Sequence, residues 1–259
     1  MAHDPERRAQ ALLALACLDL TSLNDKDTES DVAKLCERAQ GPFGPVAAVC
    51  VWPRFAAYAR GRLPTHIGVA AVANFPDGSA DIARAVRDTQ EIVQSGAQEV
   101  DVVLPYARLV EGDEACVNAL LHAVRAACPG LALKVILESG ELKTETLIRR
   151  ASLVSLNAGA DFLKTSTGKT AQSATPAVAR TMLQAIAAHP LAALRAGFKA
   201  SGGIRTVAEA TTYYSLVGEI LRVQLLGPAR CRIGASSLLD DIESVLGGGD
   251  AGQTAPGSY

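Results

Sequence analysis

Four segments that are otherwise apolar or β-branched carry a charged residue between apolar neighbours. They are Asp101 in EVDVVL (99–104), Lys134 in LALKVIL (131–137), Lys164 in DFLKTS (161–166) and Lys199 in GFKAS (197–201). A single lysine at the end of a strand can extend its ammonium group to solvent. Four charges on buried strands would instead have to pair with one another, because an unpaired buried charge is very costly.

A shared pocket of this kind predicts reactivity. A lysine that is partly desolvated and crowded by other ammonium groups has a lowered pKa, since both effects disfavour its charged form. Its amine is then a nucleophile near neutral pH, able to attack a carbonyl carbon and form a Schiff base. An aspartate beside a second lysine would move the protons that formation and hydrolysis of the imine require.

The segments that must position these residues are short apolar runs that alternate with helical segments. Eight such runs cover 13–20, 46–52, 67–75, 99–104, 131–137, 161–166, 197–201 and 231–236. Helices are expected between them, for example at 27–40 and at 79–95, where Gly96 follows as a stop signal. This alternation predicts an α/β protein with a (β/α)8 TIM-barrel fold. Strands four to seven are neighbours in such a barrel, so the four charges would converge.

The two ends of the chain lie outside this repeat. A short N-terminal helix, roughly Pro5 to Leu13, precedes the first strand, and we expect it to close the bottom of the barrel. Residues 1–246 should form one TIM-barrel domain, whose last helix is LLDDIESVL (238–246). The remaining 247–259, rich in Gly, Pro and Ser, should be a flexible C-terminal tail, which either frays or folds over a site as a lid carrying Tyr259.

Glycine- and hydroxyl-rich loops follow the last three predicted strands and favour binding of a phosphate. They are TSTGK (165–169), SGGIRT (201–206) and GASS (234–237), the last of which opens into a helix. Glycines let backbone N–H groups approach an anion, and the N-terminus of a helix favours negative charge. Loops after strands seven and eight are a frequent phosphate site in this fold. Lys169, Ser236 and Ser237 could add a charge and hydroxyl groups.

Composition and motifs exclude several other classes. The 259 residues are 49% hydrophobic with a net charge of −2, which excludes general disorder and gives no field for nucleic acid or an anionic membrane. The longest apolar stretch, Ala11 to Leu18, is far too short to span a bilayer, and no signal peptide is evident, so we expect a soluble cytoplasmic protein. The six cysteines and four histidines show no metal-binding spacing, and neither a P-loop nor a dinucleotide-binding glycine motif is present.

Seven segments, in order along nearly the whole chain, resemble the deoxyribose-phosphate aldolase family. They are LDLTSLN (18–24), CVWPRF (50–55), EVDVVLPY (99–106), KVILESGEL (134–142), GADFLKTSTGK (159–169), GFKASGGIRT (197–206) and RIGASSLL (232–239). The resemblance implies a class I aldolase of TIM-barrel fold that needs neither metal nor cofactor. Such enzymes reversibly cleave 2-deoxy-D-ribose 5-phosphate to acetaldehyde and D-glyceraldehyde 3-phosphate. It implies that Lys164 forms the Schiff base, while Asp101 and Lys199 form the proton relay.

The resemblance also implies roles for the surrounding residues. Lys134 would orient the site, and Asp19, Thr21 and Thr165 would face the sugar. The phosphate would be held by Gly168, Lys169, Gly202, Gly203, Gly234, Ser236 and Ser237. Cys50 would stand at the rim, either as a packing thiol or as a thiol that the aldehyde can trap. The family further suggests a homodimer whose partners are small phosphosugars and aldehydes.

Two other functions remain open at this level. Another Schiff-base aldolase, acting on a ketose phosphate, would share the lysine and the phosphate loops, and only a panel of substrates would separate it. A catalytically silent phosphosugar-binding barrel with a regulatory role is the alternative outside enzymes. The combination of Asp101, Lys164 and Lys199 disfavours that alternative, because a binding protein has no need of three charges buried together.

Overall fold

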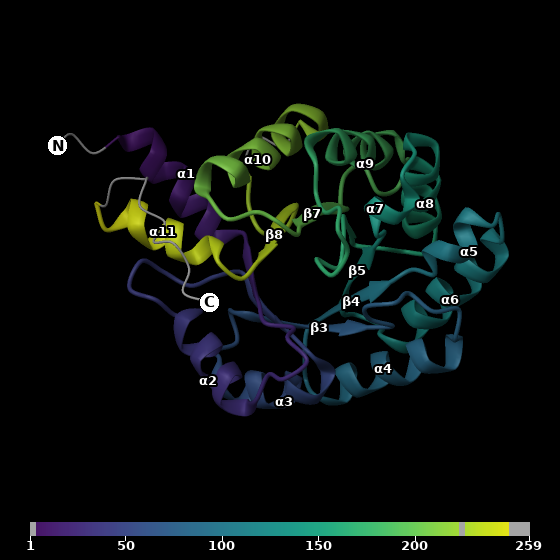
Figure 1. Cartoon of the computed structure of the whole chain (residues 1–259), viewed down its shortest axis with the longest axis horizontal. Coiled ribbons are helices and arrows are strands. Elements are labelled where there is room, and N and C mark those ends of the chain that lie inside the picture. Colours follow the sequence, from purple (N-terminus) through teal and green to yellow (C-terminus); the bar gives the residue numbers. More distant parts are fainter. Residues whose placement is uncertain (1–3, 223–225, 249–259) are drawn as a thin grey trace.

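The strands of the chain form a closed parallel barrel (Figure 1). The structure, a computed structural model, describes residues 4–222 and 226–248. Each strand pairs with the next, and the eighth pairs with the first, which confirms the predicted (β/α)8 fold. The strands are β1 (Leu18–Thr21), β2 (Ala48–Val51), β3 (Gly68–Ala73), β4 (Glu99–Val103), β5 (Ala132–Ile136), β6 (Phe162–Lys164), β7 (Gly197–Ser201) and β8 (Cys231–Ala235).

Helices surround this barrel on its outside (Figure 1). They are α1 (Pro5–Ala16), α2 (Glu29–Arg38), α3 (Pro53–Arg62), α4 (Ile82–Gln94), α5 (Tyr106–Val110), α6 (Glu114–Ala127), α7 (Ser139–Leu142), α8 (Glu145–Asn157), α9 (Pro176–Ala188), α10 (Val207–Leu221) and α11 (Leu238–Leu246). Most begin at a Ser, Thr or Asp whose side chain accepts a hydrogen bond from the first turn, as Asp81 does from Arg84 N at 2.9 Å. Within the described residues, no helix is both long and apolar enough to cross a bilayer.

The start of the chain differs from the prediction. Helix α1 continues through residues 13–16, which were expected to begin the first strand, so β1 starts only at Leu18. These residues are good helix formers, and Ala14 and Leu15 are buried on the face that α1 turns to its neighbours. That face packs on α10 and α11, where the Arg8 side chain donates to the Leu246 carbonyl at 2.9 Å.

Helix α1 therefore belongs to the helical ring, and the expectation that it closes the bottom of the barrel is wrong. The N-terminal end of the barrel instead contains a cavity of about 410 Å³. Its walls come from the segments that lead into β1, β2, β3, β4 and β8, and they include Glu99 and Arg232. The predicted tail at 247–259, with the lid role considered for Tyr259, lies outside the described residues from 249 onward.

Apolar side chains form two separate clusters. The larger lies between the barrel and the helices and contains the outward-facing strand residues, such as Val100 and Val102. The smaller lies inside the barrel, and Cys50, Val72 and Ile136 are among its members. Because alternate residues of a strand face opposite sides, Asp101 points inward between the outward Val100 and Val102. The barrel interior is thus only partly apolar, and charged side chains fill the rest.

Candidate active site

Asp101, on β4, is the centre of the buried charged groups. Its Oδ1 accepts a hydrogen bond from Lys134 Nζ at 2.8 Å, and its Oδ2 accepts from Lys164 Nζ and from Lys199 Nζ, each at 2.8 Å. The three lysines come from β5, β6 and β7, which follow β4 around the barrel. The convergence expected from the order of the strands is therefore present in the structure.

Asp19, on β1, provides a second buried carboxylate. Its Oδ2 contacts Lys199 Nζ at 2.5 Å and Lys134 Nζ at 3.4 Å, and its Oδ1 accepts from Arg232 at 2.6 Å. Lys134 also contacts Glu99. Among the ion pairs of the described residues, Lys134 thus has three carboxylate partners and Lys199 has two. Lys164 has only Asp101.

The three lysines differ in pKa because of this difference in partners. Burial alone would lower the pKa of Lys134 and of Lys199, but their carboxylate partners outweigh it and raise both. Burial lowers the pKa of Lys164 below its ordinary value, the Lys199 ammonium lowers it further, and the single carboxylate does not compensate. Burial would raise the pKa of Asp101, yet the three ammonium groups hold it well below its usual range. The site therefore contains one amine with a tendency to be neutral, beside a carboxylate that stays ionised.

Lys164 lies at the end of a cavity of about 600 Å³ at the carboxyl ends of the strands. The exposed fraction of its side chain is 4%, whereas the side chains of Lys134 and Lys199 are fully buried. The cavity is lined by Thr21, Ser22, Leu23, Asn24, Lys164, Thr167, Gly168, Lys169, Ser201, Gly202, Gly203, Ile204, Arg205, Gly234, Ala235, Ser236 and Ser237. One amine with a lowered pKa therefore faces a space large enough for a small phosphosugar.

Three glycine-containing loops, after β6, β7 and β8, make much of the wall of this cavity. Gly202 has a φ of +89°, and a Cβ there would lie 2.3 Å from Ser173 Oγ, so the close packing of these two loops requires glycine. Helix α11 begins directly after Ser236 and Ser237, which places its N-terminus at the cavity. The Lys169 ammonium donates to the Leu23 carbonyl at 2.7 Å across the mouth. These features suit an anion.

The sequence model of the protein family described as "DeoC/LacD family aldolase" matches residues 13–243 of this chain. The chain belongs to this family. A deoxyribose-phosphate aldolase of Agrobacterium fabrum is 46% identical over 253 residues, which cover 96% of each chain. The protein is therefore an aldolase, and the resemblance first read from its motifs is confirmed.

Solved structures agree with the assignment of this aldolase. A Coccidioides immitis protein assigned as a deoxyribose-phosphate aldolase superposes with a TM-score of 0.79 at 29% identity, covering 89% of this chain and 86% of that one. The deoxyribose phosphate aldolase of Aeropyrum pernix, described as a unique tetramer, superposes with a TM-score of 0.70 at 26% identity. That match covers 93% of this chain and 97% of the other.

The structure brings most of the predicted site residues of the aldolase together, but not all at the cavity wall. Thr21, Lys164 and all seven predicted phosphate residues line the cavity. Asp19, Asp101, Lys134 and Lys199 lie beneath it in the charged network. Thr165 is fully buried, and its hydroxyl bonds the carbonyl and the N–H of Ser201, at 3.1 and 2.9 Å. The hydroxyl of Thr165 therefore fixes the end of β7 rather than facing the cavity.

Cys50 lies beside Asp101, with 3.9 Å between its Sγ and Asp101 Oδ2. The side chain is fully buried. Burial raises the pKa of the thiol, and the Asp101 carboxylate raises it further, so the sulfur is protonated at neutral pH. The structure thus places Cys50 as a packing thiol inside the barrel and not at its rim.

Four charged residues of this site were missed by the sequence analysis. Arg205 lines the cavity beside the phosphate loops. Glu138 is buried and accepts hydrogen bonds from Thr167 and, at 3.1 Å, from Thr170 Oγ1, which holds the loop after β6. Glu99 and Arg232 extend the charged network toward the N-terminal end of the barrel. Glu99 could have been found from its spacing, since it stands two residues before Asp101 and must share its face.

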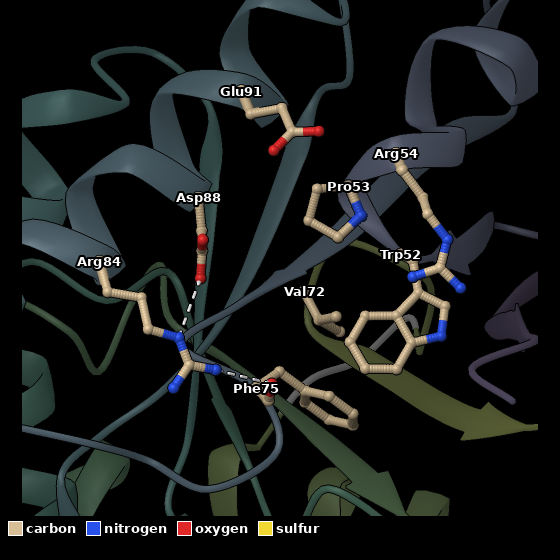
Figure 2. A pocket seen from close by; sticks show the side chains of 8 residues that line it. All are labelled: Trp52, Pro53, Arg54, Val72, Phe75, Arg84, Asp88 and Glu91. Atoms are coloured by element: carbon tan, nitrogen blue, oxygen red, sulfur yellow. Dashed lines mark hydrogen bonds and ion pairs between the residues drawn. The ribbon is translucent and has the colours of Figure 1, made fainter. Parts of the chain in front are cut away.

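A further cavity, of about 220 Å³, is lined by the ends of β2 and β3 and by residues of α3 and α4 (Figure 2). Arg84 of α4 points toward Asp88 and donates to the Phe75 carbonyl at 3.1 Å, while Trp52 and Arg54 form the opposite wall. None of the lysines of the network lines it. In residues 4–222 and 226–248, no group of three or more His, Cys, Asp or Glu side chains is arranged to hold a metal ion.

Proposed function

We propose that this enzyme is a class I deoxyribose-phosphate aldolase in which Lys164 forms the Schiff base. The overall reaction is the reversible cleavage of 2-deoxy-D-ribose 5-phosphate to acetaldehyde and D-glyceraldehyde 3-phosphate. One observation carries the assignment of the nucleophile. Of the three lysines around Asp101, only Lys164 both lines the cavity and has a lowered pKa.

In the proposed mechanism, the neutral amine of Lys164 attacks the C1 aldehyde of the open-chain sugar. Lys199 is protonated, and Asp101 bridges its Nζ to that of Lys164 with two contacts of 2.8 Å. A proton can therefore pass from Lys199 through Asp101 to the departing hydroxyl, which leaves as water and gives the iminium. The iminium then accepts the electron pair of the C2–C3 bond when that bond breaks.

Bond cleavage and release complete the cycle. The C3 hydroxyl loses its proton to the Asp101–Lys199 relay as C3 becomes the aldehyde of glyceraldehyde 3-phosphate. The two-carbon enamine left on Lys164 takes a proton at C2 and becomes the iminium of acetaldehyde. Water adds to this iminium, and acetaldehyde leaves with the amine of Lys164 regenerated. Lys134 takes no proton in these steps; it orients Asp101 through their 2.8 Å contact.

The substrate phosphate is held at the loops that follow β6, β7 and β8. Gly168, Gly202, Gly203 and Gly234 line the cavity and carry no side chain, so a phosphate can approach the backbone closely there. The hydroxyls of Ser236 and Ser237 and the N-terminus of α11 add donors and a favourable dipole, and Lys169 adds a charge. Thr21 lies at the cavity wall between these loops and the lysine, where it contacts the sugar; Asp19 acts through Lys199 from below.

The wider organisation of the protein concerns its domain, its thiols and its assembly. The described residues up to the end of α11 at Leu246 form one catalytic domain. All six cysteines are free thiols, which suits the reducing environment of the cytoplasm. The enzyme assembles as a homodimer, and light scattering coupled to size exclusion tests this directly, with a tetramer or a monomer as the contrary results.

The nucleophile is tested by intact-mass spectrometry after incubation with acetaldehyde and sodium borohydride. We expect one ethyl adduct, mapped to Lys164, in the wild type and none in Lys164→Arg, which keeps a positive charge but cannot form an imine. Labelling spread over surface lysines, or equal labelling of the variant, would remove Lys164 from this role. A panel that includes ketose phosphates then separates the proposed substrate from those of other Schiff-base aldolases.

A further inference from the structure

The charged network inside the barrel extends well beyond the residues that take part in the mechanism. Glu99 contacts Lys134 and accepts from Arg232 at 2.8 Å, while Arg232 also donates to Asp19 at 2.6 Å. Both residues are almost buried, with exposed fractions of 6% for Glu99 and 9% for Arg232. One connected set of buried ion pairs therefore joins Asp19, Glu99, Asp101, Lys134, Lys164, Lys199 and Arg232.

Glu99 and Arg232 sit at the opposite end of the barrel from the substrate cavity. They line the N-terminal cavity of about 410 Å³, and neither lines the cavity that contains Lys164. Glu99 stands two residues before Asp101 on β4, which places it about 7 Å further toward the N-terminal end. Neither residue can touch the substrate, so any effect on the reaction must pass through the network.

The charges of this network cancel only when Lys164 is neutral. Asp19, Glu99 and Asp101 provide three negative charges, and Lys134, Lys199 and Arg232 provide three positive charges. Protonation of Lys164 adds a seventh charge, for which these ion pairs of the described residues contain no further carboxylate. A buried unmatched charge is costly, so the balance of the other six groups disfavours the ammonium form of Lys164.

We propose that Glu99 and Arg232 are positioning residues that set the charge state of the Schiff-base lysine from the far end of the barrel. Their charges make the numbers of negative and positive groups in the network equal when Lys164 is neutral. The inference rests on the proposed role of Lys164. The two residues should have opposite effects on the protonation of Lys164. Loss of the Glu99 carboxylate leaves the network too positive and favours the neutral amine, whereas loss of the Arg232 guanidinium leaves it too negative and favours the ammonium.

Other titratable groups near Lys164 do not change this balance. Cys50, from β2, is a neutral thiol because burial raises its pKa. Glu138, in the segment after β5, is hydrogen bonded to Thr167 and Thr170 and makes no ion pair with the seven groups. The exposed side chains of Lys169 and Arg205 lie at the mouth, where solvent screens them. These groups are the same in every variant below.

The test is the pH dependence of Schiff-base formation, measured as the rate of acetaldehyde adduct formation on Lys164 with sodium cyanoborohydride, by intact mass. A unit charge about 10 Å away, at an effective dielectric constant of about 20, shifts a pKa by about one unit. We expect the midpoint of the acidic limb to move down by about one pH unit in Glu99→Gln and up by about one in Arg232→Met. The double variant, which restores the balance, should return near the wild-type midpoint.

Matched variants separate charge from structure. Arg232→Lys keeps the positive charge and should keep the wild-type midpoint. Like Arg232→Met, it loses the two hydrogen bonds, of 2.8 and 3.3 Å, that the Arg232 guanidinium donates to the Glu99 carboxylate. If the two residues had a purely structural role, adduct formation would be slower with unchanged midpoints, or the losses in rate of the two single variants would add in the double variant. Either result overturns the inference. If Arg232→Met does not give a folded barrel by circular dichroism, Glu99→Gln decides alone, and an unmoved or raised midpoint counts against it. Absence of any adduct on wild-type Lys164 would instead contradict the proposed function.

Discussion

Replacement of Asp101 by asparagine should strongly destabilise the fold, because it keeps the size of the side chain but removes the charge that the Lys134 and Lys199 ammonium groups share and that Lys164 also contacts. Removing one partner of a buried ion pair typically costs about 3–5 kcal/mol. The lysines set an upper limit to this loss of stability. The variant can relieve its excess charge by releasing one proton, and from an ordinary lysine pKa of about 10.4 this costs about 4.6 kcal/mol at a pH of about 7. We therefore expect a loss of about 3–5 kcal/mol in the free energy of unfolding.

The loss in the free energy of unfolding also depends on pH. In the folded variant one lysine has a pKa below its unfolded value, so the folded state holds fewer protons than the unfolded chain. Stability of such a state rises with pH. At a pH of about 9 the cost of releasing the proton is only about 2 kcal/mol. The deficit of Asp101→Asn relative to the wild type should therefore shrink by as much as about 2.7 kcal/mol between these two conditions.

Urea unfolding followed by circular dichroism at the two pH values measures both quantities. Lys164→Met is the matched control, since it removes one 2.8 Å hydrogen bond and an amine that tends to be neutral. Because the lowered pKa of Lys164 makes the wild type less stable at the lower pH, the stability of this control relative to the wild type should fall as the pH rises, in the opposite sense to Asp101→Asn. A deficit for Asp101→Asn below about 1 kcal/mol, or one that is equal at both pH values, would refute the account of the network as a set of interdependent charges.

Three further predictions concern the surroundings of the site. Glu138→Gln weakens the hold on the loop after β6, and should raise KM for deoxyribose 5-phosphate several-fold while leaving KM for unphosphorylated deoxyribose nearly unchanged; equal effects on both would contradict its role. Gly234→Ala places a Cβ 2.9 Å from Lys199 Cε, so kcat should fall at least about tenfold, in steady-state assays, with the fold retained by circular dichroism. Alkylation by iodoacetamide should reach the half-buried Cys116 first and leave Cys50 protected until the protein unfolds; early labelling of Cys50 in peptide maps would show that its burial is not maintained.

The barrel and the reactive centre were predictable because each leaves a regular signal. Eight apolar runs gave the count of strands, and a lysine inside such a run is unusual enough to be noticed on its own. The boundary between α1 and β1 was not predictable in the same way. Residues 13–16 are apolar in either structure, and their packing against α10 and α11, which decides for the helix, comes from residues more than 190 positions later.

The lower half of the network was missed for a different reason. Arg232 interrupts the apolar run 231–236 as Lys199 interrupts 197–201, so the same criterion applied to the last strand would have found it. The position of Thr165 could not be found from its motif. Its hydroxyl is directed by the backbone of Ser201 on the neighbouring strand, and a pairing between strands that are 36 residues apart is a property of the barrel and not of the local sequence.

Stability and reactivity have a common origin in this barrel. The side chains of the inner apolar cluster are mostly small or medium in size, Ala70 and Cys50 among them, and long charged side chains occupy the remaining interior. Such an interior is stable only if its charges are matched, since water cannot compensate them. With three carboxylates against four cationic side chains, matching requires that one of the four give up its proton. Lys164 has the fewest carboxylate partners and the only access to the cavity, so the requirement for a neutral core leaves the reactive amine where the substrate binds.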